Sequence, residues 1–231
     1  MVAAAAAVGD QMGGRTAMGE LCALYWYPIY AYARRRGLGP EDAEDATQSF
    51  FRSILAENLF AAADPSLGRL RSFLLKAFGR DLADARRDGA RQKRGGGAEV
   101  VSLDLLAAEN RFQAEAPGGE PTRVFEAAWA ATVLEGALRR VEADYAATGR
   151  SAVFTALRPC LGAGGGRVFE PAQLAISLGL SDVALRQAIS RLRDRFRTAL
   201  RAQVADTLRE PTEAAIDEEL QSLRALLAAG V

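Results

Sequence analysis

The sequence predicts an all-α fold with two helical domains, a linker between them and a C-terminal helix. Apolar residues recur every three or four positions through most of the 231 residues, which is typical of amphipathic helices. No segment shows the strict alternation of a half-buried strand. Clusters of glycine and proline interrupt the helical pattern and mark the boundaries. These breaks predict a first domain over 15–95, a linker over 96–120, a second domain over 121–206 and an acidic C-terminal helix over 207–231.

Three helices make up the first domain. The apolar stripe of the first helix runs through Met18, Leu21, Tyr25, Ile29 and Tyr32, and Pro28 within it predicts a kink or a helix start. Pro40 opens the second helix, and the acidic residues that follow it suit the positive end of the helix dipole. The third helix is expected from about Arg69 to Lys93, where three consecutive glycines end it.

The linker should hold at most one short helical turn, because it is rich in glycine and proline. The second domain should contain helices over 122–147, 151–157, 171–178 and 181–205. Pro211 is expected to open the last helix, with Ile216, Leu220, Leu223 and Leu227 facing inward. We expect this acidic helix to pack on the second domain; the alternatives are that it shields that domain's arginines or binds a regulator.

Composition argues against an enzyme. The chain has no histidine, which removes the usual general bases, histidine zinc sites and serine triads. Cys22 and Cys160 are too few for a disulfide framework or an all-cysteine metal site and should be small buried residues, and Trp26 and Trp129 should lie in the core. No apolar run reaches about eighteen residues, and the first ten residues lack a basic stretch. A cytoplasmic protein without a cofactor or membrane insertion is therefore expected.

Charge is segregated along a chain whose 29 basic and 29 acidic residues cancel. Acidic residues dominate 40–58 and 206–231, whereas basic residues dominate 69–94 and 181–201. Such blocks favour separate contact surfaces over general solubility.

The third helix carries a basic stripe opposite an apolar one. At 100° per residue, six basic side chains fall within about 60° of one another: Arg69, Lys76, Arg80, Arg87, Arg91 and Arg94. A stripe of this length fits the phosphates of a nucleic acid. Phe73 lies near its edge and could stack on an unpaired base. The alternatives are a solvated face for the basic residues and a core position for Phe73.

Residues 171–181 and the helix after them have the pattern of a helix-turn-helix. Ala175 is small where two helices must cross, Gly179 suits a turn with positive φ, and Ser181 can cap the second helix. Leu185 and Leu192 share one face of that helix with Ile189 and Phe196. The opposite face, where a major groove would lie, carries Arg186, Gln187, Ser190 and Arg191. Purely structural helix pairs can share this geometry.

Together these segments resemble the bacterial sigma-70 family of RNA polymerase sigma factors, in the extracytoplasmic-function (ECF) group. Residues 42–51, DAEDATQSFF, resemble the DAEDLxQxxF signature of sigma region two, and residues 71–75, RSFLL, with Arg86 and Arg87 resemble its continuation. Residues 171–197 are similar to sigma region four. The resemblance spans roughly 17–94 and 122–205 and has its signatures in the expected order.

The resemblance implies binding without covalent chemistry. The second helix would dock on core RNA polymerase through Asp42, Asp45, Gln48 and Phe51. The loop over 59–69 and the third helix would hold the minus-ten promoter element through Asp64, Arg69, Arg71, Phe73, Lys76, Arg80, Arg87, Arg91 and Arg94. The helix-turn-helix would read the minus-thirty-five element through Ser181, Arg186, Gln187, Ser190, Arg191 and Arg193.

The expected partners are core RNA polymerase, promoter DNA and an anti-sigma factor or other regulator, with a monomer as the free state. Two other functions fit the same helices. A stand-alone helix-turn-helix regulator would bind its operator tightly without polymerase. An adaptor would occupy a sigma-binding surface without directing initiation.

Overall fold

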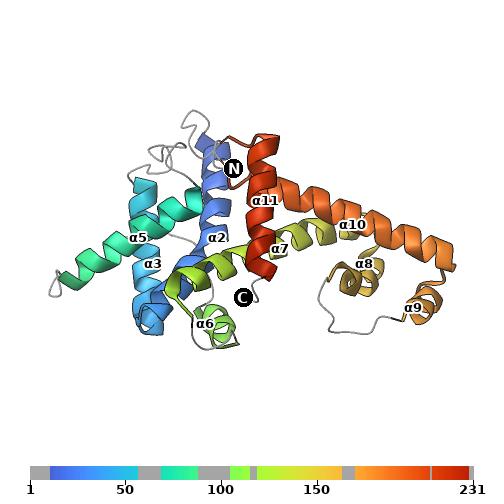
Figure 1. Ribbon diagram of the computed structural model, residues 1–231, viewed down its shortest axis with the longest axis horizontal. Helices are drawn as coiled ribbons and strands as arrows, with labels where there is room; N and C mark the ends of the chain where they lie inside the picture. The colour runs from blue at the N-terminus through green and yellow to red at the C-terminus, as the bar shows by residue number, and fades with distance from the viewer. Residues whose placement is uncertain are drawn as a thin grey trace. The chain divides into compact units, whose positions relative to one another are not determined.

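The structure is a computed structural model that describes residues 11–56, 69–87, 105–114, 119–162, 170–208 and 210–228, all-helical with no strand among them (Figure 1). Within these residues no helix has the length and apolar character needed to span a bilayer. In chain order the helices are α2 (Gln11–Arg35), α3 (Pro40–Ala56), α5 (Leu70–Arg87), α6 (Leu105–Ala114), α7 (Pro121–Ala147), α8 (Ser151–Leu157), η2 (Arg158–Leu161), α9 (Pro171–Leu178), α10 (Asp182–Ala205) and α11 (Glu213–Ala228).

The chain divides into two compact units. The first unit is discontinuous and combines residues 1–132 with residues 204–231, whereas the second is the single stretch 133–203. Both boundaries fall inside helices, one in α7 and one in α10. Each unit is described on its own below.

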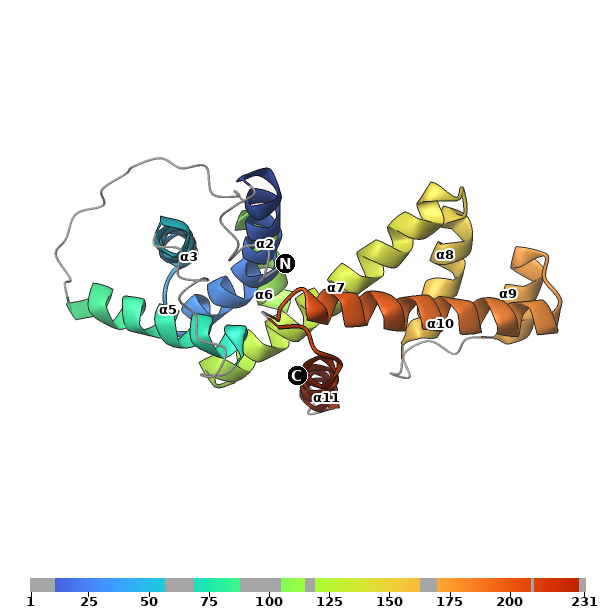
Figure 2. The ribbon, with the colours of Figure 1, turned by 90° about the horizontal axis from the view of Figure 1, so that it is seen from above.

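An aromatic core holds α2, α3 and α5 together in the first unit. Trp26 stacks on Tyr30 with ring centroids 5.3 Å apart, and Phe78 of α5 contacts both Phe50 of α3 and Tyr32 of α2. Figure 2 views α3 nearly end-on while α5 lies lengthwise, so these two packed helices cross. Trp26 and Trp129 are both buried, as the sequence predicts. Helix α2 continues through Pro28 rather than starting there.

The prediction that the linker has at most one helical turn is wrong. Helix α6 is ten residues long and belongs to the first unit, where it contacts α2 and α3. Its Ala108 is buried, and the guanidinium of Arg111 lies 4.0 Å from the ring centroid of Tyr27. These tertiary contacts stabilise a helix too short to be stable alone.

The expectation that the C-terminal helix packs on the second domain is not met for the part of that domain that carries the helix-turn-helix. Helix α11 belongs to the first unit, where Ile216, Glu219 and Leu223 are buried. It begins two residues later than the sequence suggests: Thr212, rather than Pro211, precedes the helix and accepts a hydrogen bond from the backbone N–H of Ala215 at 3.2 Å. Its inward face meets the beginning of α5, as described below.

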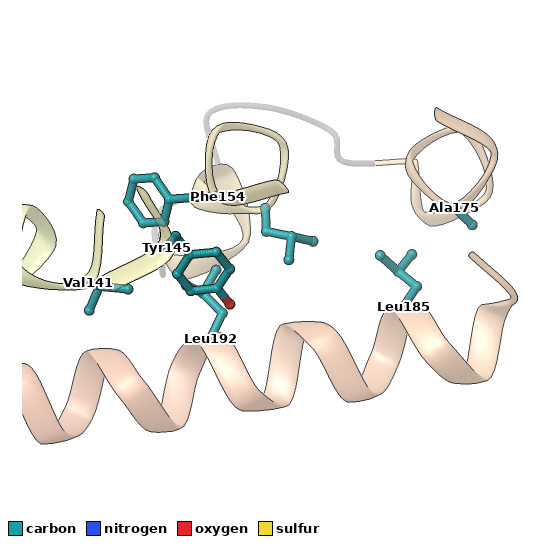
Figure 3. Packing of buried hydrophobic residues seen from close by; sticks show 7 residues of the cluster. Val141, Tyr145, Phe154, Ala175, Leu185 and Leu192 are labelled. Carbon is teal, nitrogen blue, oxygen red and sulfur yellow. The ribbon is translucent and has the colours of Figure 1, made fainter. Parts of the chain in front are cut away.

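The second unit has a separate core between α7, α8, α9 and α10. Figure 3 shows how its side chains converge. Tyr145 packs on Phe154 with ring centroids 5.7 Å apart, and Leu185 and Leu192 of α10 are buried in the same cluster. Ala175 is the buried residue of α9 and faces Leu185, as expected for two helices that cross closely (Figure 3).

Candidate nucleic-acid interface

Helix α5 presents part of the predicted basic stripe to solvent. Lys76 and Arg80 are exposed, whereas Leu74 and Phe78 on the opposite side are buried. Arg80 Nε donates to the backbone carbonyl of Lys76 at 3.4 Å, which holds the Arg80 side chain along the helix. Phe73 is half-buried, so it is neither a fully buried core residue nor fully available for stacking on a base. Arg87 ends the helix and its side chain is not described; Asp64, Arg91 and Arg94 lie outside the described residues.

Arg71 does not face solvent, so its predicted contact with DNA is wrong for this structure. It is 3% exposed, and its guanidinium lies 4.2 Å from the ring centroid of Trp129 in α7. An ion pair joins it to Glu219 of α11. Burial lowers the pKa of the Arg71 guanidinium to about 10, and the nearby charge of Arg69 acts in the same direction. Arg71 therefore remains charged at neutral pH and holds α5, α7 and α11 together.

Arg69 is the first residue of the basic stripe, and two acidic side chains already engage it. Its Nε lies 2.9 Å from Glu219 Oε2, and its Nη2 lies 3.8 Å from Glu218 Oε1. Arg69 and Arg71 therefore share the carboxylate of Glu219. This carboxylate is buried, because Glu219 is only 3% exposed. The sequence analysis missed both glutamates. The sequence signal that could have indicated this contact is the opposite charge of two segments, the acidic 206–231 and the basic 69–94.

Helix α3 has the acidic face that the sequence predicts, but one of the four predicted docking residues, Phe51, does not lie on it. Asp42 and Asp45 are exposed near the helix start. The Gln48 amide is half-buried and bonded on both sides, because its Nε2 donates to Glu44 at 3.0 Å and its Oε1 accepts from Arg52 at 3.1 Å. Phe51 is fully buried and packs on Phe50, so it is a core residue and its prediction as a docking residue is wrong.

The helix-turn-helix has the local geometry that its sequence predicts. Gly179 ends α9 with φ +62°, a left-handed conformation that glycine adopts without strain. The backbone N–H of Leu180 then donates to the carbonyl of Ala175 at 2.9 Å. The Ser181 hydroxyl accepts a hydrogen bond from the N–H of Ala184 at 3.3 Å and so caps α10.

The outward face of α10 is polar and accessible. Four of the predicted base-reading residues are exposed there: Arg186, Gln187, Ser190 and Arg191. Val183, which the sequence analysis did not single out, shares this face and is 55% exposed. Arg193 has a structural role, because its Nε and Nη2 donate to the carbonyl of Cys160 at 3.3 and 3.1 Å. These bonds fix η2 against α10, while Arg193 as a residue is exposed, so its role as a base reader stays a prediction.

No group of three or more histidine, cysteine, aspartate or glutamate side chains among the described residues could hold a metal ion. Cys22 and Cys160 are both buried, as predicted, and burial raises the pKa of the Cys22 thiol to about 11. The described residues therefore present three exposed polar surfaces: the acidic start of α3 and the basic side of α5 in the first unit, and the outward face of α10 in the second.

Comparison with known proteins gives no family assignment. No protein-family model, no curated protein and no solved structure matches this chain. The functional conclusion therefore depends on the residues and geometry described above.

Proposed function

We propose that this chain is a sigma factor, which binds core RNA polymerase and directs promoter recognition and transcription initiation in the cytoplasm. One observation carries the proposal furthest: the helix-turn-helix presents arginine, glutamine and serine side chains on the outward face of α10 while Leu185 and Leu192 are buried behind them. Arginine and glutamine are the side chains that make paired hydrogen bonds to guanine and adenine in the major groove. In this proposal, that face reads the upstream minus-thirty-five element.

The first unit supplies the other two functions in this proposal. The α5 side chains Lys76 and Arg80 contact phosphates around the minus-ten element, where melted bases leave the stack. Unstacking costs a few kcal/mol per base, which binding of the unpaired strand must offset. The acidic start of α3, with Asp42 and Asp45, docks on a basic surface of core polymerase.

The two DNA contacts are weak by themselves in this proposal and act through polymerase. Joining them to one large partner raises the effective concentration of each contact once the other is made. The chain then works by binding alone and is expected to be monomeric when free.

The test is in vitro transcription with purified core polymerase and a library of genomic promoter fragments. The proposal predicts initiation at a discrete set of promoters only when this chain is added, and weak binding of duplex promoter DNA by the chain alone. Tight operator binding by a dimer of the isolated chain, without polymerase, would identify a stand-alone regulator instead. Polymerase binding that never leads to initiation would identify an adaptor.

A further inference from the structure

The contact between α11 and the beginning of α5 has a consequence for nucleic-acid binding. We propose that α11 is an intramolecular competitor: its carboxylates occupy Arg69, so the single-stranded DNA that α5 binds must displace them. This inference rests on the proposed function of α5 and adds a means of regulating it.

Charge at the contact supports competition. Arg69 immediately precedes α5, and at 100° per residue it falls on the same side as Lys76 and Arg80, so it extends their stripe beyond the helix start. Two carboxylates take the place that a phosphate would take beside it, Glu219 at 2.9 Å and Glu218 at 3.8 Å. Glu218 is also 75% exposed, so its negative charge faces any polyanion that approaches Arg69. A phosphate can gain Arg69 only as these two ion pairs are lost.

The packing beneath the contact explains why α11 stays in place without DNA. Glu219 is buried with Arg71, and removing either partner would leave an uncompensated charge in a site of low polarity. Ile216 and Leu223 are buried on the same face of α11. The exposed pair between Arg69 and Glu218 is the weaker part of the contact and the part that can be altered without unfolding.

The first experiment measures binding of a fluorescein-labelled, single-stranded DNA 20-mer to the full-length chain by fluorescence anisotropy. Glu218→Gln should tighten binding about two- to five-fold, the factor expected for loss of one exposed ion pair. Glu210→Gln removes the same charge just before α11 and is the matched control. It should have a smaller effect, because charges that do not contact the stripe are largely screened at physiological salt. In an Arg69→Gln background, Glu218→Gln should give no gain.

Equal gains from the two glutamate variants, or a gain that persists in the Arg69→Gln background, would overturn the competition. Circular dichroism on the same samples shows that the variants are folded. Transcription with core polymerase separates this inference from the proposed function. Initiation with no Glu218-specific gain would overturn the competition alone. A Glu218-specific gain without initiation would overturn the sigma function alone.

A second readout follows the displacement itself. Trp26→Phe leaves Trp129 as the single tryptophan, in contact with the Arg71 guanidinium. If the 20-mer displaces α11, Arg71 loses Glu219, water reaches Trp129 and its emission shifts to longer wavelength. An anisotropy increase at saturating 20-mer with unchanged Trp129 emission would show that α11 remains bound, which contradicts the proposal.

Discussion

Glu109 of α6 accepts two hydrogen bonds from the guanidinium of Arg34 in α2, at 2.9 and 3.0 Å. Tyr30 donates a third at 2.6 Å, and Gln113 donates a fourth at 2.7 Å. These donors, the Arg34 guanidinium first, lower the pKa of Glu109 from 4.5 to about 2. Segments about 75 residues apart in the chain are thus joined by one carboxylate.

Glu109→Gln should lower the free energy of unfolding by about 1–2 kcal/mol at pH 7, because a charged acceptor is replaced by a neutral one. A carboxylate with a lowered pKa stabilises the folded state above its unfolded pKa of 4.5, and this stability is lost as the pH falls toward 2. The difference between wild type and Glu109→Gln should therefore shrink in urea unfolding at pH 2.5. Glu20→Gln, at an exposed position of α2, is the control. A difference that stays constant down to pH 2.5 would contradict the role of this carboxylate.

The double change Asp42→Lys with Asp45→Lys should abolish binding to core polymerase while the chain stays folded. Both residues are exposed near the start of α3, so part of their effect is helix stabilisation, about a few tenths of a kcal/mol each. Only a docking face also predicts repulsion from a basic partner surface. Fluorescence anisotropy with labelled core polymerase measures the loss, and circular dichroism measures folding. Glu142→Lys with Asp144→Lys, on exposed positions of α7, changes the net charge equally and should keep polymerase affinity. If the folded Asp42/Asp45 variant binds core polymerase with wild-type affinity, this face of α3 is not the docking surface.

Arg186→Ala and Arg80→Ala should have different effects on sequence preference. Arg186 lies exposed near the start of α10, where a base contact would contribute about 1–3 kcal/mol of discrimination. Arg80 lies on the α5 stripe, where a phosphate contact would not depend on sequence. Competition between matched and mismatched promoters, with polymerase present, measures both effects. Equal losses on both promoters for Arg186→Ala would exclude base reading by this residue.

Gly179→Ala should destabilise the second unit by about 1–2 kcal/mol, because alanine is strained at φ +62°. The helix-turn-helix would lose stability without losing any side chain of its polar face. Gly162→Ala is the matched control: Gly162 has φ −69°, and an added Cβ would lie 3.7 Å from the nearest atom, the carbonyl oxygen of Pro159. Urea unfolding followed by circular dichroism should separate the two variants, and equal stability would contradict the strain.

Helical periodicity predicted burial better than the family resemblance did. At 100° per residue, Arg71 falls on the apolar side of α5 with Phe78, away from Lys76, and the structure buries it there. The resemblance alone had placed Arg71 among the DNA contacts. Phe51 was also placed by the resemblance alone, and the structure buries it in the core instead of on the acidic face.

Contacts between distant segments could not be predicted from the sequence. Nothing in the composition of the linker indicates that Glu109 contacts Arg34. The helical pattern of α6 covers only ten residues, and the glycines on either side of it favour a loop. The position of α11 depends on the buried carboxylate of Glu219, which forms ion pairs with Arg69 and Arg71 far earlier in the chain. Local signals such as the Gly179 turn and the Ser181 cap involve neighbouring residues only, and these were predicted correctly.

The discontinuity of the first unit sets an order of events during synthesis on the ribosome. Residues 133–203 form one continuous stretch, so every contact within that unit can form before Glu219 is synthesised, whereas Arg71 must wait for Glu219. The first unit is therefore completed after the second unit, whose residues lie between its two segments. This is the reverse of the usual N-terminal-first order. Until α11 emerges, Arg71 lacks the carboxylate that pairs with it, and the face that α11 covers stays uncovered.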